Sequence, residues 1–206
     1  MTPEREIVYV VDDDPRIRDS LAELLASFGL VVQCFGSAND YLQHNRDDTC
    51  ACLVLDIQLP GLDGLELQEQ LAAIGPPIVF ITGHGDIPRS VRAIKAGAVE
   101  FLTKPVNSDA LIAAIHIAFA RDRRERAENA NLAALRQRWS TLTPREREVL
   151  PLIVAGLRNK QAAWNLGITE VTMQVHRGQV MRKMAARSFA ELVRMSEKLG
   201  LAPPLL

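Results

Sequence analysis

Three consecutive carboxylates follow an apolar segment near the start of the chain. The segment "IVYVV" runs directly into Asp12, Asp13 and Asp14, and like charges this close raise one another's pKa unless something offsets them. Asp56 ends another apolar run, "CLVLD". Because Mg²⁺ prefers carboxylate oxygens and keeps positions for water and a phosphate oxygen, these acids predict a magnesium site that takes a phosphoryl group.

A hydroxyl and an ammonium group stand at the ends of two further apolar runs. Thr82 ends the apolar run "PIVFIT", and Lys104 ends "VEFLTK". A carboxylate can act as a nucleophile toward phosphorus, and a hydroxyl and an ammonium group can neutralise charge on phosphoryl oxygens. We therefore expect Asp56 to be the phosphoryl acceptor, with Thr82 and Lys104 binding the oxygens.

The elements that position these side chains are visible in the pattern of the first 120 residues. Apolar runs of strand length alternate with amphipathic segments of helix length, which predicts a parallel sheet covered on both faces. We expect a doubly wound α/β fold of five strands, whose chemistry lies at the carboxyl ends of the strands. The strands are expected at 7–11, 30–35, 52–56, 77–82 and 99–104, and the helices at 15–29, 37–44, 64–75 and 87–98. Asp14 directly precedes Pro15 and is expected to cap the first helix rather than bind metal.

Composition and charge favour a two-domain chain with a nucleic-acid surface. The chain has 206 residues, of which 48% are hydrophobic, and this content excludes general disorder. Residues 1–120 hold 17 acidic and 8 basic residues, whereas residues 121–206 hold 8 acidic and 16 basic ones, an asymmetry typical of a C-terminal nucleic-acid-binding part. We find no signal peptide and no apolar stretch long enough for a membrane span. We therefore expect a cytoplasmic protein with no membrane partner.

Four segments resemble one known family in matching order and spacing. The segments "VVDDD", "LVLDIQLPGLDG", "VFITGHGD" and "AVEFLTKP" resemble the flavodoxin-like receiver domain of two-component response regulators. The resemblance implies that Asp56 takes a phosphoryl group from a phosphohistidine on a sensor histidine kinase. It also implies that Mg²⁺ is held by Asp12, Asp13, Asp56 and the main-chain carbonyl of Gln58.

The same resemblance implies a conformational switch. Thr82 is expected to move to the phosphoryl group, and Phe101 is expected to turn inward behind it. Phe101 stands where many receivers carry tyrosine. The inward turn of the ring is therefore still expected, but the hydroxyl group of tyrosine is absent. The peptide bond between Lys104 and Pro105 is expected to be cis.

A long helix is predicted to follow the receiver. Residues 107–139 contain neither proline nor glycine, begin with capping residues and are rich in alanine, leucine, arginine and glutamate. We place the receiver at residues 1–120, a helical linker that continues its last helix at 121–139, and a second domain at 140–206.

The C-terminal part carries strong helix signals. Thr143 with Glu146 and Ser188 with Glu191 have capping-box spacing, and four helices are expected. The string "LTPREREVLPLIVAGLRNKQAAWNLGITEVTMQVHRGQVMRKM" resembles the LuxR-type helix-turn-helix domain, so the whole chain resembles a FixJ/NarL-type response regulator. This resemblance makes 159–166 the supporting helix and 169–184 the recognition helix.

Within this motif, Met173, Val180 and Met184 are expected to face the core, and Trp164 is expected to pack between helices or domains. Gln174 is suited to reading adenine and Val175 to contacting a thymine methyl group, while Lys160, Arg182 and Lys183 suit phosphates. The full set of candidate DNA-binding residues is Asn159, Lys160, Thr169, Thr172, Gln174, Val175, His176, Arg177, Gln179, Arg182 and Lys183.

The function expected from these features is that of a DNA-binding response regulator. Phosphorylation of Asp56 is expected to favour a homodimer that binds double-stranded promoter DNA, and the chain is expected not to be an enzyme beyond weak self-dephosphorylation. Two alternatives stay open. One is a transcription regulator that senses a protein or small ligand without phosphorylation. The other is an aspartate-based phosphatase, which would need a second acid two residues after Asp56, where this chain has Gln58.

Overall fold

The structure is a computed structural model that describes residues 6–46, 48–72, 75–83 and 87–201. Residues 84–86 of the segment "VFITGHGD" and residues 73–74 of the predicted third helix lie outside these ranges. Internal contacts divide the chain into two units, residues 1–126 and residues 127–206. The first unit thus includes six residues that the sequence assigned to the linker.

The first unit is built on a parallel five-stranded sheet, as predicted. The strands are β1 (Glu6–Val11), β2 (Val31–Phe35), β3 (Cys50–Asp56), β4 (Ile78–Thr82) and β5 (Glu100–Thr103). Their order is β2-β1-β3-β4-β5, and all neighbouring pairs are parallel. Because β1, β3 and β4 are adjacent in the middle of the sheet, the side chains that follow or end them must meet at one edge.

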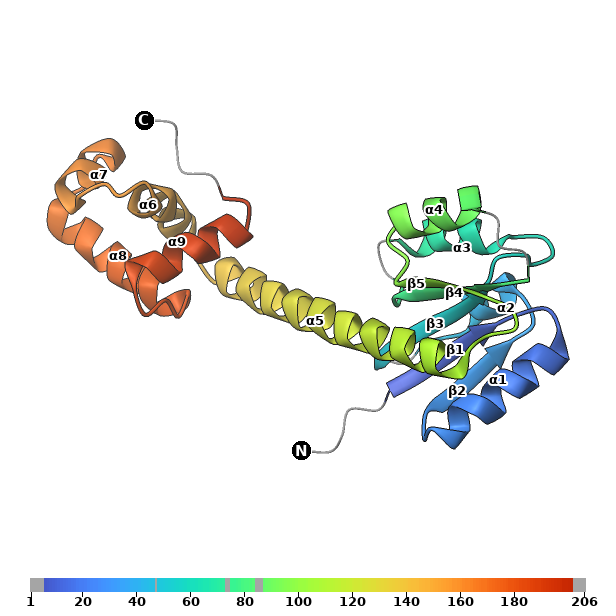
Figure 1. The fold of residues 1–206 in the computed structure, drawn as a ribbon. Coiled ribbons are helices and arrows are strands. Elements are labelled where there is room, and N and C mark those ends of the chain that lie inside the picture. The colour runs from blue at the N-terminus through green and yellow to red at the C-terminus, as the bar shows by residue number, and fades with distance from the viewer. Residues whose placement is uncertain (1–5, 47, 73–74, 84–86, 202–206) are drawn as a thin grey trace. The chain divides into compact units, whose positions relative to one another are not determined.

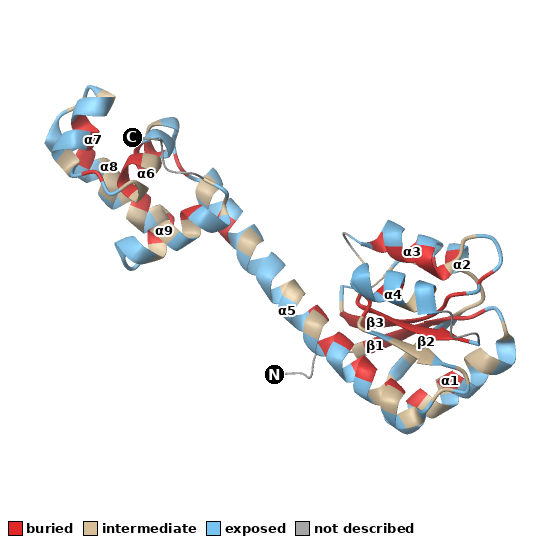
Figure 2. Ribbon diagram, turned by 45° about the horizontal axis from the view of Figure 1, so that its top comes forward, coloured by how far each residue is buried: buried red, intermediate tan, exposed pale blue. Residues whose placement is uncertain are grey.

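Helices cover both faces of this sheet (Figure 1). They are α1 (Pro15–Ser27), α2 (Ala38–Gln43), α3 (Gly64–Leu71), α4 (Ile87–Lys95) and the first half of α5 (Ser108–Ser140). Alternate strand residues enter two separate cores, as the pleat requires. One core lies under α2, α3 and α4 and includes Tyr9 and Phe80, and the other lies under α1 and α5 and includes Val54 and Phe119. Figure 2 shows the central strands buried between these layers.

The second unit is entirely helical among the residues that the structure describes. It contains the last part of α5 (residues 127–140) and the helices α6 (Pro144–Val154), α7 (Asn159–Leu166), α8 (Glu170–Lys183) and α9 (Phe189–Lys198). The helices α7 and α8 form the predicted helix-turn-helix. Met173, Val180 and Met184 are fully buried in its core, as expected. None of the described helices combines the length and apolar character needed to cross a membrane.

Candidate functional site

The carboxyl edge of the sheet brings the predicted acids together. One carboxylate oxygen from each of Asp12, Asp13 and Asp56 lies within 4.8 Å of the others. Asp12 and Asp56 are buried, whereas Asp13 is exposed. Three carboxylates at this separation, one of them open to solvent, form a donor set that suits a hard dication such as Mg²⁺ and leaves a side from which a phosphoryl group can enter. The residues present therefore fit the implied metal.

Lys104 forms ion pairs with two of these acids. Its Nζ lies 2.6 Å from Oδ2 of Asp12 and 2.6 Å from Oδ2 of Asp56. Burial lowers the pKa of Lys104, but the hydrogen bonds to the two carboxylates outweigh burial and hold the pKa above its ordinary value. Burial raises the pKa of Asp12, and the hydrogen bond from Lys104 offsets this only in part. The ammonium group therefore stays charged where it can meet a phosphoryl oxygen.

Backbone contacts hold the two buried acids in place. The Arg18 guanidinium donates to the carbonyl oxygen of Asp12 (2.6 Å), and the Gln58 amide donates to Oδ1 of Asp56 (3.1 Å). Gly64, the first residue of α3, lies so close to the end of β3 that a Cβ there would come within 2.4 Å of the Asp56 carbonyl oxygen. Only glycine allows this approach, so Gly64 lets the start of α3 lie against the carboxyl end of β3, next to Asp56. Gly64 ends the segment "LVLDIQLPGLDG", and the sequence pattern alone assigned it no role.

The residues of the expected switch lie at the next two strands. Thr82 is buried at the end of β4, and its carbonyl oxygen accepts a hydrogen bond from the Lys104 amide (2.7 Å). Phe101 is half-buried in β5 and packs against the core under α2, α3 and α4. The Lys104–Pro105 peptide bond is cis, which confirms that prediction.

Asp14 has the separate role predicted for it. Its side chain caps α1 by accepting from the Arg16 amide (2.9 Å), and it forms an ion pair with the Arg16 guanidinium. The hydrogen bond from Arg16 lowers the pKa of Asp14. Its oxygens do not belong to the group that Asp12, Asp13 and Asp56 form.

A groove of about 740 Å³ lies beside the acidic cluster. Apolar side chains of α1, among them Ile17, Leu21 and Leu24, form one wall, and Pro105 and Val106 belong to the segment that follows β5. Lys104 also lines this groove. A segment of another protein bound in the groove would therefore lie next to Lys104, which contacts Asp56.

The second unit presents one exposed face of α8. Val171 is 71% exposed and Val175 is 56% exposed, and they lie one helical turn apart. Thr172, Gln174, Gly178 and Arg182 are exposed as well, whereas His176, Arg177 and Gln179 are half-buried. Val171 was missed by sequence reasoning, although its position four residues before Val175 could have indicated it.

Hydrogen bonds fix several candidate DNA-binding side chains. The Arg177 guanidinium donates to Oδ1 of Asn159 (3.3 Å), which links α8 to the start of α7. The Thr169 hydroxyl caps α8 by accepting from the Thr172 amide (3.1 Å), and the Arg182 guanidinium donates to Oε1 of Gln179 (2.5 Å). Lys160 is exposed on α7.

Lys183 is placed differently from the sequence-based expectation. Its Nζ lies 2.6 Å from Oε2 of the buried Glu146 and donates to the carbonyl oxygen of Thr141 (3.3 Å). Glu146 also accepts from the Thr143 amide (2.8 Å), as a capping box requires. The ammonium group is thus bound within the unit, and Lys183 is not among the proposed DNA contacts.

This ion pair gives a prediction about stability. Burial raises the pKa of Glu146, but the hydrogen bonds from Lys183 and the Thr143 amide outweigh it and hold the pKa below its ordinary value. The stabilisation is therefore fully present above the ordinary glutamate pKa of about 4.3 and is lost as the pH falls through the folded-state pKa. Replacing Lys183 with methionine is expected to lower the free energy of unfolding at pH 7 by about 1–3 kcal/mol, because a buried carboxylate loses one of its hydrogen-bond donors.

The measurement is urea unfolding followed by tryptophan fluorescence. Both tryptophans, Trp139 and Trp164, lie in the second unit, so the signal reports that unit alone. The difference in the free energy of unfolding between variant and wild type should shrink as the pH falls below the ordinary glutamate pKa. Lys198→Met, which removes an exposed ammonium group, is the control. An equal loss in both variants at pH 7 would contradict the role given to the pair.

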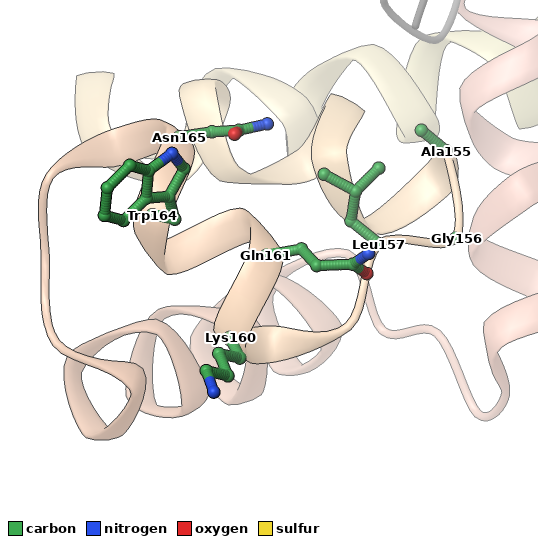
Figure 3. A pocket seen from close by; sticks show the side chains of 7 residues that line it. All are labelled: Ala155, Gly156, Leu157, Lys160, Gln161, Trp164 and Asn165. Atoms are coloured by element: carbon green, nitrogen blue, oxygen red, sulfur yellow. The ribbon is translucent and has the colours of Figure 1, made fainter.

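Trp164 does not pack between helices of this unit, so that part of the expectation is wrong. Its side chain is 86% exposed, because α7 directs Ala162 and Ala163 into the core. It lies at one end of a shallow pocket of about 670 Å³, with Ala155 and Leu157 at the other end (Figure 3). All residues that line this pocket come from positions 155–165, so it is separate from the exposed face of α8.

Comparisons with known proteins agree with both halves of this description. Residues 8–116 match the family "Response regulator receiver domain", and residues 140–196 match "Bacterial regulatory proteins, luxR family". Nodulation protein W of Bradyrhizobium diazoefficiens is 50% identical over 96% of this chain and 88% of its own length. FixJ of Azorhizobium caulinodans is 42% identical over 98% of this chain and 96% of its own length.

Solved structures show the same similarity. The response regulator StyR is 49% identical with a TM-score of 0.82, and the match covers 94% of this chain and 99% of StyR. Full-length FixJ from B. japonicum is 40% identical with a TM-score of 0.55, and the match covers 98% of this chain and 99% of that one. The chain therefore belongs to the two-component response regulators in which a receiver domain is joined to a LuxR-type DNA-binding domain, and it regulates transcription.

Proposed function

We propose that Asp56 accepts a phosphoryl group from a phosphohistidine of a sensor histidine kinase, and that the phosphorylated chain dimerises and binds promoter DNA. The observation that carries this proposal is the position of Lys104. Its ammonium group contacts Asp12 and Asp56 at 2.6 Å each, where Asp13 also converges. A nucleophilic carboxylate, further acids and a cation at one edge form a pocket for a phosphoryl group.

The acids Asp12, Asp13 and Asp56, together with the main-chain carbonyl of Gln58, would hold Mg²⁺. When bound, Mg²⁺ supplies positive charge that offsets the crowded carboxylates and the oxygens of the entering phosphoryl group.

The transfer itself needs little from the chain beyond position and charge. One carboxylate oxygen of Asp56 forms a bond to phosphorus while the bond from phosphorus to the histidine nitrogen breaks, and the imidazole leaves with that electron pair. Lys104 binds a phosphoryl oxygen and neutralises its charge. The residue two positions after Asp56 is Gln58, which cannot donate a proton to a leaving group as a carboxylic acid would. This difference favours an acceptor over a phosphatase.

The groove along α1 supports a helical kinase partner. Its wall of Ile17, Leu21 and Leu24 is an apolar stripe at helical spacing, the surface that an amphipathic helix of another protein can pack against. Since Lys104 lines the same groove, a histidine carried on such a helix is brought close to Asp56.

The switch follows from competition for Lys104. A phosphoryl dianion on Asp56 attracts the ammonium group now shared between Asp12 and Asp56 and offers acceptor oxygens to the Thr82 hydroxyl. Movement of Thr82 would leave room for Phe101 to turn inward. Because a ligand shifts a conformational equilibrium only by its differential free energy, these new contacts are the source of the change.

We propose that the dimer forms through the face at residues 87–109. Ile87, Val91 and Ile94 on α4 are 75%, 45% and 45% exposed, and their spacing puts them on one side of the helix. This apolar stripe lies on the helix that follows β4 in the chain. A shift of Thr82 at the end of β4 can therefore change the orientation of α4 and the exposure of its apolar side chains. A second copy of the chain is the partner that would cover it.

DNA contacts are proposed for the exposed face of α8 and the start of α7. Gln174 would read adenine, Val175 would contact a thymine methyl group, and Lys160 and Arg182 would contact phosphates. Asn159, Thr169, Thr172, His176, Arg177 and Gln179 complete the proposed interface.

The function is tested with a DNA duplex selected from a random library by the purified chain. Labelling by acetyl phosphate with Mg²⁺ should raise the affinity for this duplex about tenfold or more, within the range of allosteric coupling, and should double the mass measured by light scattering. Labelling that changes neither affinity nor mass would instead support a regulator that works without phosphorylation.

Two substitutions on α8 should weaken DNA binding in different ways. Gln174→Ala should lower the affinity for the selected duplex by about 1–3 kcal/mol and relax the base preference at one position. Arg182→Ala should weaken binding to all duplexes alike and reduce the dependence of log affinity on log salt by about one. Fluorescence anisotropy over a salt series, on the selected duplex and on its single-base variants, separates the two. Uniform weakening by Gln174→Ala would contradict base readout.

A further inference from the structure

Four residues of α5 contact the first unit near the amino-terminal ends of the strands. The proposed phosphorylation pocket lies at the carboxyl ends of the same strands. The four residues are Arg121, Asp122, Arg123 and Arg126, here called the α5 clamp. Each contacts a different segment of the first unit. Arg123 forms an ion pair with Glu6 of β1, and Arg126 binds the side chain (2.6 Å) and the carbonyl oxygen (2.9 Å) of Asp48.

Asp122 is the buried member of the clamp. Its Oδ2 accepts a hydrogen bond from the Ala51 amide (3.2 Å), and Nε of Arg126 lies 3.9 Å from the same oxygen. Ala51 belongs to β3, the strand that ends at Asp56. The clamp and the phosphoacceptor therefore lie at opposite ends of one central strand.

Arg121 binds the turn between α4 and β5. Its guanidinium donates to the carbonyl oxygen of Gly97 (2.7 Å) and to Oε1 of Glu125 (2.8 Å). Gly97 has a φ of +94°, which favours glycine. Its amide donates to the Ile94 carbonyl (2.9 Å), so Gly97 is fixed to the last turn of α4 and moves with it.

Apolar packing does not hold this part of α5. Phe119 is buried under the sheet, and the next buried apolar side chain on the helix is Leu135, which lies in the other unit. Residues 121–126 are thus placed by directional hydrogen bonds and ion pairs. Such contacts either form or break with small displacements, whereas apolar side chains tolerate sliding.

We propose that Arg121 is a positioning residue that transmits the state of α4 to α5 through the Gly97 carbonyl, and that the other clamp residues keep this stretch of α5 on the sheet while it does so. This inference rests on the proposed function. A change that starts at Thr82 reaches α4, the next helix in the chain. It displaces Gly97 together with α4 and alters the contact that holds α5 where the helix leaves the receiver.

The experiment compares wild type, Arg121→Ala, Arg121→Lys and Arg136→Ala as full-length chains. Each is titrated with the selected duplex before and after labelling by acetyl phosphate with Mg²⁺, and the ratio of the two affinities is taken. Arg121→Ala should label as wild type does, because Arg121 is remote from the pocket. Its affinity ratio should fall to about a third of the wild-type ratio or less. Arg121→Lys keeps a donor and should recover most of the ratio.

Arg136→Ala is the matched control, since it removes an equal charge from an exposed position of the same helix. Its ratio should equal that of wild type. A wild-type ratio in Arg121→Ala, or an equal loss in Arg136→Ala or Arg121→Lys, would overturn the inference. A wild-type chain that gains no affinity on labelling would refute the proposed function itself, and the inference with it.

Discussion

Replacing Asp56 with asparagine is expected to abolish phosphoryl labelling of the chain. Asparagine nearly preserves the shape of the side chain but supplies an amide, which is a poor nucleophile toward phosphorus. Lys104 keeps its 2.6 Å contact with Asp12, so the fold and the basal DNA affinity should change little. Incubation with labelled acetyl phosphate and Mg²⁺ should give one acid-stable, base-labile phosphoryl group per wild-type chain and none in the variant.

The DNA and mass measurements extend this prediction. The variant should show the same affinity for the selected duplex with and without donor, and it should stay at monomer mass. Asp40→Asn, an exposed acid in the first turn of α2, is the matched control and should behave as wild type. Label in the Asp56 variant together with a wild-type gain in affinity would show that another residue is the acceptor.

Replacing Asp13 with alanine is expected to raise the Mg²⁺ concentration needed for half-maximal labelling by more than about tenfold, since loss of even outer groups of a metal site has effects of this size. Asp13 is the exposed acid of the group whose oxygens lie within 4.8 Å, so its loss removes a proposed Mg²⁺ ligand without leaving a buried polar group unpaired. The variant should also release far less heat in a calorimetric titration with Mg²⁺.

Asp14→Ala should give the opposite pattern. Because Asp14 caps α1 and pairs with Arg16, its loss should lower the melting temperature modestly and leave the Mg²⁺ dependence of labelling unchanged. The two neighbouring variants are controls for each other. If Asp14→Ala lost Mg²⁺ affinity as completely as Asp13→Ala, the division between a metal site and a helix cap would be refuted.

The charge of Lys104 gives an expectation for the pH dependence of labelling in the wild-type chain. Lys104 keeps its charge because hydrogen bonds to two carboxylates hold its pKa above the ordinary value. As the pH rises through the neutral range, the Lys104 ammonium group should therefore stay charged and should not cause phosphoryl labelling of the wild type to fall.

Sequence alone determined the first unit and its pocket to a large extent. Parallel strands can be recognised as continuous apolar runs between amphipathic helices, and their carboxyl ends meet at one edge. The positions of Asp12, Asp56 and Lys104 at strand ends predicted their convergence, which the structure shows. Thr82 ends the neighbouring strand β4.

Tertiary structure decided which face of each helix meets a neighbour. Helical spacing separated the core stripe of Met173 and Val180 from the polar positions, but it could not say that Lys183 meets Glu146 while Arg182 stays exposed. Periodicity likewise could not show that Trp164 faces solvent, because tryptophan side chains are on average highly buried.

The α5 clamp shows the same limit most clearly. The segment "RDRRER" reads as a solvated charged run, yet Asp122 is buried and Arg121 and Arg126 bind backbone carbonyls far away in the chain. The residue types determined that these side chains are donors and acceptors. Their partners depend on which sheet edge α5 crosses, and only packing of the apolar stripe ending at Phe119 sets that position.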